Sequence, residues 1–148
     1  MISWWKNERT KMITYQQVVG PWISHKDLTQ ARKDNIYKLL GFCARLEEKM
    51  LSNGVVFLIN QTTESGISGK LYGGFRPQSC PVGAPRSNHK EGLALDRYDP
   101  DNKIDNWCMD NLGVLEECNI WIEHPDKTDR WSHWQCVPPK SGNRVFYP

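Results

Sequence analysis

Residues 87–96 carry the side chains in this sequence that are best suited to chemistry. They read S-N-H-K-E-G-L-A-L-D, so His89 and Asp96 flank Gly92, a residue that permits a tight turn between two arms. A second element, D-R-W-S-H-W-Q, offers His133 downstream. Zinc accepts imidazole nitrogen and carboxylate oxygen, and a catalytic zinc site needs three protein ligands and one open position. We therefore predict one Zn²⁺ ion bound by His89, Asp96 and His133.

These residues resemble the metal site of the zinc D-alanyl-D-alanine carboxypeptidase family, which includes VanX-like dipeptidases and phage endolysin-type peptidoglycan peptidases. The first half of that family's site is S-x-H-x-x-G-x-A-x-D, which residues 87–96 match. The second half is a W-x-H element, here residues 131–133. An Arg in an element similar to Gly73-Gly74-Phe75-Arg76-Pro77 usually lies upstream. The similarity extends from about residue 28 to the end of the chain.

The resemblance implies a zinc-dependent metallopeptidase that hydrolyses peptide bonds in peptidoglycan stem peptides, as in a phage endolysin or another cell-wall hydrolase. It leaves open whether the bond is a terminal D-Ala-D-Ala bond or an internal bond of the L-Ala–D-Glu type. Arg76 would hold a substrate carboxylate or carbonyl, because a guanidinium pairs with two oxygen atoms at once. We expect Arg76 to contact the substrate and not the metal. Ser87 would support the site through a hydrogen bond.

The sequence departs from the family at the general base, the group that takes the proton of the attacking water. In the family this base is a Glu three residues before the last ligand or a His two residues before it, but these positions hold Arg130 and Trp131 here. Neither side chain accepts a proton at neutral pH. Glu123 is our first choice for the base, and Asp129 and His124 are the alternatives.

A β-hairpin would bring Glu123 to the metal. The residues on either side of the turn-forming segment 124–129 each predict a strand. Side chains alternate between the two faces of a strand, so a register with residue 123 opposite residue 131 points Glu123 and His133 to the same side. A register shifted by one residue would bring His124 or Asp129 forward instead.

Apolar residues that recur at steps of three and four predict two helices, from about 28 to 51 and from about 104 to 118. We expect Thr29 to cap the first helix, and Asp101 or Asn102 to cap the second.

The strands outside the hairpin are expected at residues 55–60 and 93–96. Between them lies a long loop rich in Gly, Ser and Pro, which carries Arg76 towards the metal motif. The tail from residue 138 is expected to be extended along the surface. The N-terminal extension, residues 1–26, is poorly assigned and would form a short helix or strand at the domain edge.

Together these elements predict an α+β fold: a single domain over residues 1–148 whose small, mainly antiparallel sheet carries the zinc site, with helices packed on one side. A chain of 148 residues has the usual size of one domain. The odd number of cysteines, 5, and the absence of a C-x-x-C motif favour free, buried thiols.

Charge and hydropathy limit the partners. The net charge is only +2, with 19 basic and 17 acidic residues, which argues against a dedicated nucleic-acid binder. No apolar run approaches the roughly 20 residues that span a bilayer, so we expect no membrane insertion. The first residues lack the apolar core of a signal peptide, so we expect a protein that is cytoplasmic when made and acts on the cell wall after release. We also expect a monomer.

Two other functions remain open. A non-catalytic zinc-containing binding or structural module on the same fold would explain why the general base is missing from its usual place. A sugar-binding module would use the 7 Trp residues and would need no zinc. We assign most of these Trp residues to the core instead.

Overall fold

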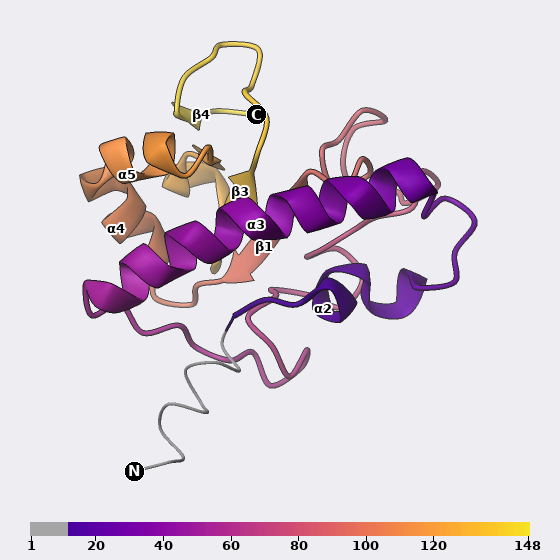
Figure 1. Cartoon of the computed structure of the whole chain (residues 1–148), viewed down its shortest axis with the longest axis horizontal. Coiled ribbons are helices and arrows are strands. Elements are labelled where there is room, and N and C mark those ends of the chain that lie inside the picture. Colours follow the sequence, from indigo (N-terminus) through magenta and orange to yellow (C-terminus); the bar gives the residue numbers. More distant parts are fainter. Residues whose placement is uncertain (1–11) are drawn as a thin grey trace.

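The chain folds as an α+β domain around a four-stranded sheet, and a computed structural model describes residues 12–148 of it (Figure 1). The strands lie in the order β1 (Ala94–Tyr98), β3 (Trp131–Gln135), β2 (Trp121–Glu123) and β4 (Val145–Phe146). β3 pairs antiparallel with β1 and β2, whereas β4 pairs parallel with β2. The predicted fold class is confirmed. The expectation about a signal peptide concerns residues 1–11, which lie outside the described residues.

One long helix covers the sheet. The helical elements of residues 12–148 are α2 (Tyr15–Val19), η1 (Gly20–Trp22), α3 (Gln30–Ser52), α4 (Lys103–Asp110), α5 (Leu112–Glu117) and η2 (Pro125–Lys127). In Figure 1, α3 crosses in front of β1 and β3, and both α2 and α5 contact it. The described part of the N-terminal extension thus takes the helical option. None of these helices has the length and apolar content needed to span a membrane.

The sequence explains where α3 begins and what it buries. The Thr29 hydroxyl accepts a hydrogen bond from the backbone N–H of Arg32, as predicted for an N-cap. Apolar residues at steps of three and four then form a buried stripe: Ile36, Leu39, Cys43, Leu46 and Met50. Each large apolar side chain buried in this way contributes about 1.5–3 kcal/mol. The helix ends at Asn53, which is followed by Gly54 in a left-handed conformation.

The sheet separates the core from the candidate site. Along β1, Leu95 packs in the core and Arg97 forms an ion pair with Glu47 of α3. Asp96 stands between these two residues and therefore points to the opposite face. On β3, Trp134 packs in the same core and leaves its neighbour His133 on the face of Asp96. One face of the sheet therefore packs on α3, while the other is available for chemistry.

The predicted strand at residues 55–60 is absent. Phe57 is buried under the guanidinium of Arg97, but Val56 on one side and Leu58 on the other are exposed. The outer edge of β1 is taken by residues 66–73, whose backbone exchanges hydrogen bonds with Asp96 and Tyr98. Residues 55–60 therefore have no strand edge to pair with. The loop that carries Arg76 is fixed to the sheet instead.

The predicted helix at residues 104–118 is two helices, α4 and α5, because the chain turns at Asn111 (φ −135°, ψ 45°). Of the two predicted caps, Asn102 occupies the N-cap position of α4, but its side chain makes no capping hydrogen bond. The two carboxylate oxygens of Asp99 accept the backbone N–H groups of Ile104 and Asp105 instead. The tail after residue 138 is not only a surface segment, because it contributes β4.

All five cysteines are free and buried, as expected. The assignment of most Trp residues to the core is confirmed for the described residues, because Trp121 and Trp134 are buried and Trp22 and Trp107 are half-buried and pack against the core. Trp131 is half-buried and lines a cleft instead. Trp4 and Trp5 lie outside the described residues.

Candidate metal centre

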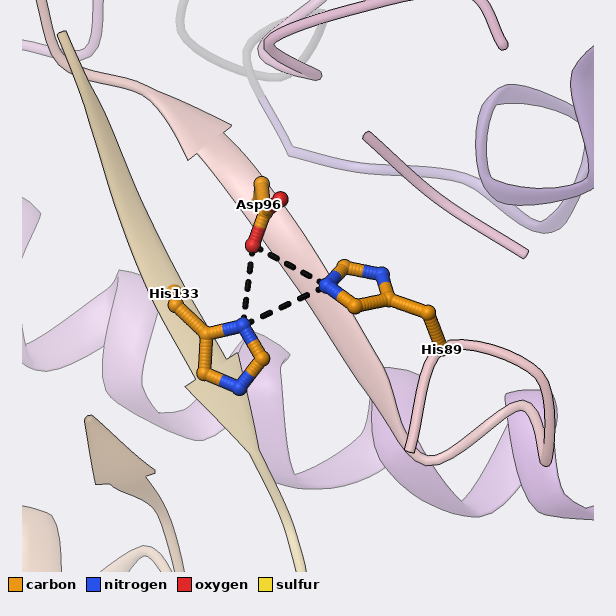
Figure 2. Close-up of side chains that lie close together, drawn as sticks. All are labelled: His89, Asp96 and His133. Carbon is orange, nitrogen blue, oxygen red and sulfur yellow. Dashed lines mark hydrogen bonds and ion pairs between the residues drawn. The ribbon is translucent and has the colours of Figure 1, made fainter. Parts of the chain in front are cut away.

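Two paired strands and a turn bring His89, Asp96 and His133 together (Figure 2). Asp96 on β1 and His133 on β3 are direct partners in the antiparallel register. His89 comes from the turn before β1, and Figure 2 shows its ring reaching across to the two strand residues. The three predicted ligands, distant in sequence, thus meet on the face of the sheet opposite α3.

The potential ligand atoms form a small triangle. Asp96 Oδ1 lies 2.9 Å from His133 Nδ1 and 3.2 Å from His89 Nε2, and the two imidazole nitrogens are 3.3 Å apart. All three side chains are buried, with 8% or less of each exposed. A buried group of two imidazoles and one carboxylate with this spacing could hold a metal ion.

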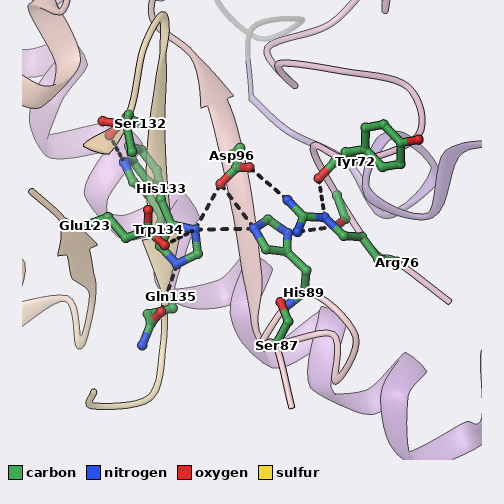
Figure 3. Close-up of polar contacts among 12 residues, drawn as sticks. Tyr72, Arg76, Ser87, His89, Asp96, Glu123, Ser132, His133, Trp134 and Gln135 are labelled. Carbon is green, nitrogen blue, oxygen red and sulfur yellow. Dashed lines mark hydrogen bonds and ion pairs between the residues drawn. The ribbon is translucent and has the colours of Figure 1, made fainter. Parts of the chain in front are cut away.

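Each of the three side chains is held by its other polar atom (Figure 3). His89 Nδ1 donates to the carbonyl oxygen of Gly74 (2.9 Å). His133 Nε2 donates to Gln135 Oε1 (2.8 Å), and Asp96 Oδ2 accepts from Arg76 Nη2 (3.3 Å). These outer contacts orient the rings and leave His89 Nε2, His133 Nδ1 and Asp96 Oδ1 facing one point, as in ordinary metal sites.

Two glycines make this arrangement possible. A Cβ atom at Gly74 would lie 2.1 Å from the carbonyl oxygen of Val18, so only glycine lets residue 74 approach α2 and present its own carbonyl to His89. Gly92 has φ +75°, and a Cβ there would lie 2.7 Å from the carbonyl oxygen of Arg32 on α3. The turn between His89 and Asp96 is therefore pressed directly onto the long helix.

The charges of the site favour a cation. Burial alone would raise the pKa of Asp96, but the charges and hydrogen bonds of His89 and His133 outweigh it and hold that pKa well below its usual range. Burial alone would lower the pKa of His133, but its hydrogen bond to Asp96 and the charge of that carboxylate raise it. The site therefore stabilises positive charge between these groups, either a proton or a metal ion.

The structure gives Arg76 a contact that the sequence did not predict. Its Nη2 pairs with the metal-ligand candidate Asp96, and its Nε donates to the carbonyl oxygen of Tyr72 (2.7 Å). Arg76 therefore braces Asp96. It also lines the cleft in front of the site, so a contact with substrate remains a prediction. Ser87 supports the turn as expected, because its hydroxyl accepts the backbone N–H of His89.

Glu123 lies beside the site, although its predicted strand partner is wrong. Ile122 pairs with Trp134, which sets Glu123 beside His133 and not beside Trp131. The difference is two residues, so Glu123 still faces the metal side. Its Oε1 is 3.8 Å from His133 Nδ1. Glu123 does not belong to the group whose ligand atoms all lie within 4.8 Å of one another. Its position suits a neighbour of the metal better than a fourth ligand.

The two alternative bases lie elsewhere. His124 accepts the backbone N–H of Asp126 at the start of η2 and stacks on Tyr147, and it does not line the cleft. Asp129 is exposed and lines a neighbouring part of the cleft together with Arg76 and Asp96. Of the three candidates, the structure brings only Glu123 to the His133 imidazole.

A cleft of about 600 Å³ opens in front of the three side chains. Its wall includes the described C-terminal residues Phe146 and Pro148 and the exposed cations Arg86 and Lys140. Gln135, which the sequence reasoning missed, lies in the same wall. The sequence could have predicted this place for Gln135. It follows His133 by two residues on a predicted strand, and residues two positions apart on a strand point to the same face.

Comparison with known proteins adds no family to these observations. No family model matches the chain, no curated protein matches it, and no solved structure matches it.

Proposed function

We propose that this protein is a zinc-dependent peptidase that hydrolyses peptide bonds in peptidoglycan stem peptides. The observation that carries the proposal is the triangle of ligand atoms with a carboxylate beside it. Zinc bonds of about 2.0–2.1 Å in a tetrahedral arrangement put neighbouring ligand atoms roughly 3.4 Å apart. The distances of 2.9, 3.2 and 3.3 Å among Asp96, His89 and His133 are close to that value.

A zinc ion held there would act as a Lewis acid on a carbonyl oxygen and lower the pKa of a water molecule to about 7. The protein must then supply a proton acceptor. Glu123 Oε1 lies 3.8 Å from His133 Nδ1 and lines the cleft. In this proposal it would take a proton from water and return it to the departing amine nitrogen. No other carboxylate within residues 12–148 pairs with that imidazole apart from the proposed ligand Asp96.

The choice of substrate depends on the motif. Residues 87–96 match S-x-H-x-x-G-x-A-x-D at every defined position, and residues 131–133 supply the W-x-H element. The cleft has a volume of about 600 Å³ and is bordered by the cations Arg86 and Lys140, which suits substrates with carboxylate groups such as stem peptides.

A non-catalytic metal-containing module is the second candidate. It is favoured by Arg130 and Trp131, which occupy the positions where the family carries its base. The open cleft and the place of Glu123 support the peptidase more strongly, because a purely structural metal site is normally closed by four protein ligands.

The test is turnover of purified peptidoglycan with metal analysis on the same samples. We expect the zinc-loaded protein to release peptide products. Glu123→Gln should keep the zinc content and lose about 10²–10⁴-fold in rate, the usual effect of general acid–base catalysis. His133→Ala should lose both zinc and activity. Zinc binding without any turnover of peptidoglycan would support the non-catalytic module, and full zinc content in His133→Ala would contradict the ligand set.

A further inference from the structure

Residues 55–59, with the sequence V-V-F-L-I, form an apolar segment that follows the end of α3 and belongs to no helix or strand (Figure 1). Phe57 is only 1% exposed, whereas Val56 is 61% exposed and Leu58 is 42% exposed. Such alternation between inside and outside is typical of a strand that lays one face on a core. The segment therefore has the composition and the side-chain pattern of a strand, although no strand within residues 12–148 pairs with it.

The backbone of this segment has hydrogen-bond partners only at its two ends. Val55 donates its N–H to the carbonyl oxygen of Met50, and Asn60 donates its N–H to that of Ser65. Between these two residues, the N–H and C=O groups of residues 56–59 form no hydrogen bond with any part of residues 12–148. Unpaired strand edges attract other strands, and proteins usually prevent such pairing with charged residues or proline. Residues 54–63 contain neither, so this edge is open to a partner strand.

The segment is complementary to a second copy of itself. In an antiparallel pair, side chains that lie directly opposite each other point to the same face. A two-fold axis through Phe57 pairs the whole run of residues 55–59, and Val56 of each copy then lies opposite Leu58 of the other copy. Both of these side chains are exposed and apolar, so each contact buries apolar surface. Because residues 54–63 carry no charge, the pairing brings no like charges together.

We propose that two copies of this chain associate through residues 55–59, which pair as antiparallel strands about a two-fold axis. This inference is independent of the peptidase proposal, and it revises the expectation of a monomer. The contact is short, and its exposed apolar side chains are Val56, Leu58 and Ile59. The interface therefore belongs to the small end of specific interfaces, and we expect a reversible dimer with a Kd of about 1–100 µM.

Sedimentation velocity of the full chain, at a series of concentrations on both sides of this Kd, tests the association. We expect the wild type to change from monomer to dimer and to grow no further, because each copy offers one such segment. In hydrogen exchange, the amides of residues 56–59 should become better protected as the concentration rises. A wild type that stays monomeric at every concentration would overturn the proposal. Growth past the dimer without a plateau would overturn it as well.

A pair of complementary charges tests the register. Val56→Lys and Leu58→Glu each place a charge opposite an apolar side chain of the other copy, so each variant alone should raise the Kd of the dimer about tenfold. An equimolar mixture of the two variants should recover the dimer, because the two introduced charges then lie opposite each other.

Leu112→Glu on α5 is the matched control, because Leu112 is 41% exposed and Leu58 is 42% exposed. This control should dimerise as the wild type does. Wild-type association of the Leu58→Glu variant would contradict the proposed interface. A mixture of Val56→Lys and Leu58→Glu that associates no better than either variant alone would contradict the pairing of Val56 with Leu58.

Discussion

At the residue scale, Gln135 decides which nitrogen of His133 is available to a metal. Its Nε2 donates to the carbonyl oxygen of Val137 (2.8 Å), so its Oε1 is the atom that faces His133. An amide oxygen only accepts, and therefore His133 Nε2 carries the proton. His133 Nδ1 is left as the atom that faces Asp96. A neighbouring residue thus selects the ring tautomer that a metal requires.

We expect Gln135→Leu to weaken zinc binding by about 10–100-fold, the usual effect of losing such an outer contact. Gln135→Glu keeps an acceptor at the same place and serves as the matched control, with affinity close to that of the wild type. Competition with a chelator of known affinity measures the difference. Equal affinities of the Leu and Glu variants would show that Gln135 does not orient the ring.

Fixed spacing is what made the three ligands predictable from sequence. His89, Asp96 and His133 follow a motif, and the structure brings them together. The brace from Arg76 to Asp96 was not predictable, because it depends on how a Gly-rich loop pairs with the edge of β1. For Glu123, strand alternation predicted the correct face, but turn geometry sets the partner residue, and η2 shifts it by two positions.

At the scale of elements, the turn before β1 is shaped by its contact with α3. Gly92 lies against the backbone of Arg32 and the side chain of Ile36. The Asn35 side-chain amide also donates to the carbonyl oxygen of Glu91 (2.9 Å). The position of His89, three residues before Gly92, is therefore fixed by a helix more than 35 residues earlier in the chain.

Gly92→Ala should reduce the free energy of unfolding by roughly 1–3 kcal/mol, because the new methyl group meets α3 and the backbone has a positive φ. Zinc affinity should fall as well, since the turn that carries His89 must move. Gly113→Ala on α5 is the control, because a Cβ there would meet no atom within 4 Å beyond its chain neighbours and the backbone of its own helix. The control should be neutral or up to about 1 kcal/mol more stable. Denaturant titrations and zinc competition check both variants, and a stable Gly92→Ala protein with normal zinc affinity would contradict the argument.

A second inter-element contact lies behind β3. Asp105 on α4 is fully buried and accepts a hydrogen bond from the Thr128 hydroxyl (2.8 Å). Burial raises the pKa of Asp105 from 3.8 to about 6, although hydrogen bonds from Ser132 and Thr128 act in the opposite direction. This carboxyl group links α4 to Thr128 and to Ser132, the residue that precedes His133.

The raised pKa predicts a pH dependence of stability. Between about pH 4 and pH 6 the folded chain keeps a proton on Asp105 that the unfolded chain has lost, so this residue makes stability fall as the pH rises. A rise of this pKa from 3.8 to about 6 corresponds to at most about 3 kcal/mol of stability. Asp105→Asn cannot titrate and should flatten the curve of unfolding free energy against pH in this range. An identical slope in the variant and the wild type, measured by urea denaturation, would rule out this assignment.

Two of the predicted secondary-structure elements are wrong, because the structure there is decided by contacts with other parts of the chain and not by the local pattern of residues. The apolar run at residues 55–60 has the composition of a strand, but the loop at residues 66–73 occupies the edge of β1 that it would need. The apolar spacing of residues 104–118 continues through Asn111, which gave no sign of the turn between α4 and α5. The helix α3 was predictable because a long periodic stripe and a capping residue agree.

At the scale of the whole molecule, one face of the sheet packs in the core and the other face carries the candidate site. The α3 face carries the core residues Leu95 and Trp134, and the other face carries the site residues Asp96 and His133. The strands that hold the ligands are therefore held rigid by the core directly behind them. Sites built on packed strands keep their geometry better than sites built on loops alone.

The parallel pairing of β4 with β2 has a consequence for handling the protein. It brings Phe146 and Pro148 into the wall of the cleft in front of His89, Asp96 and His133, so any residues joined after Pro148 begin at that cleft. An affinity tag or fusion partner placed there would compete with a peptide for the same space. We expect a C-terminal hexahistidine tag to lower activity and to obscure metal analysis by presenting imidazoles to the site. The same tag placed before Met1, or removed by a protease before assay, is the appropriate comparison.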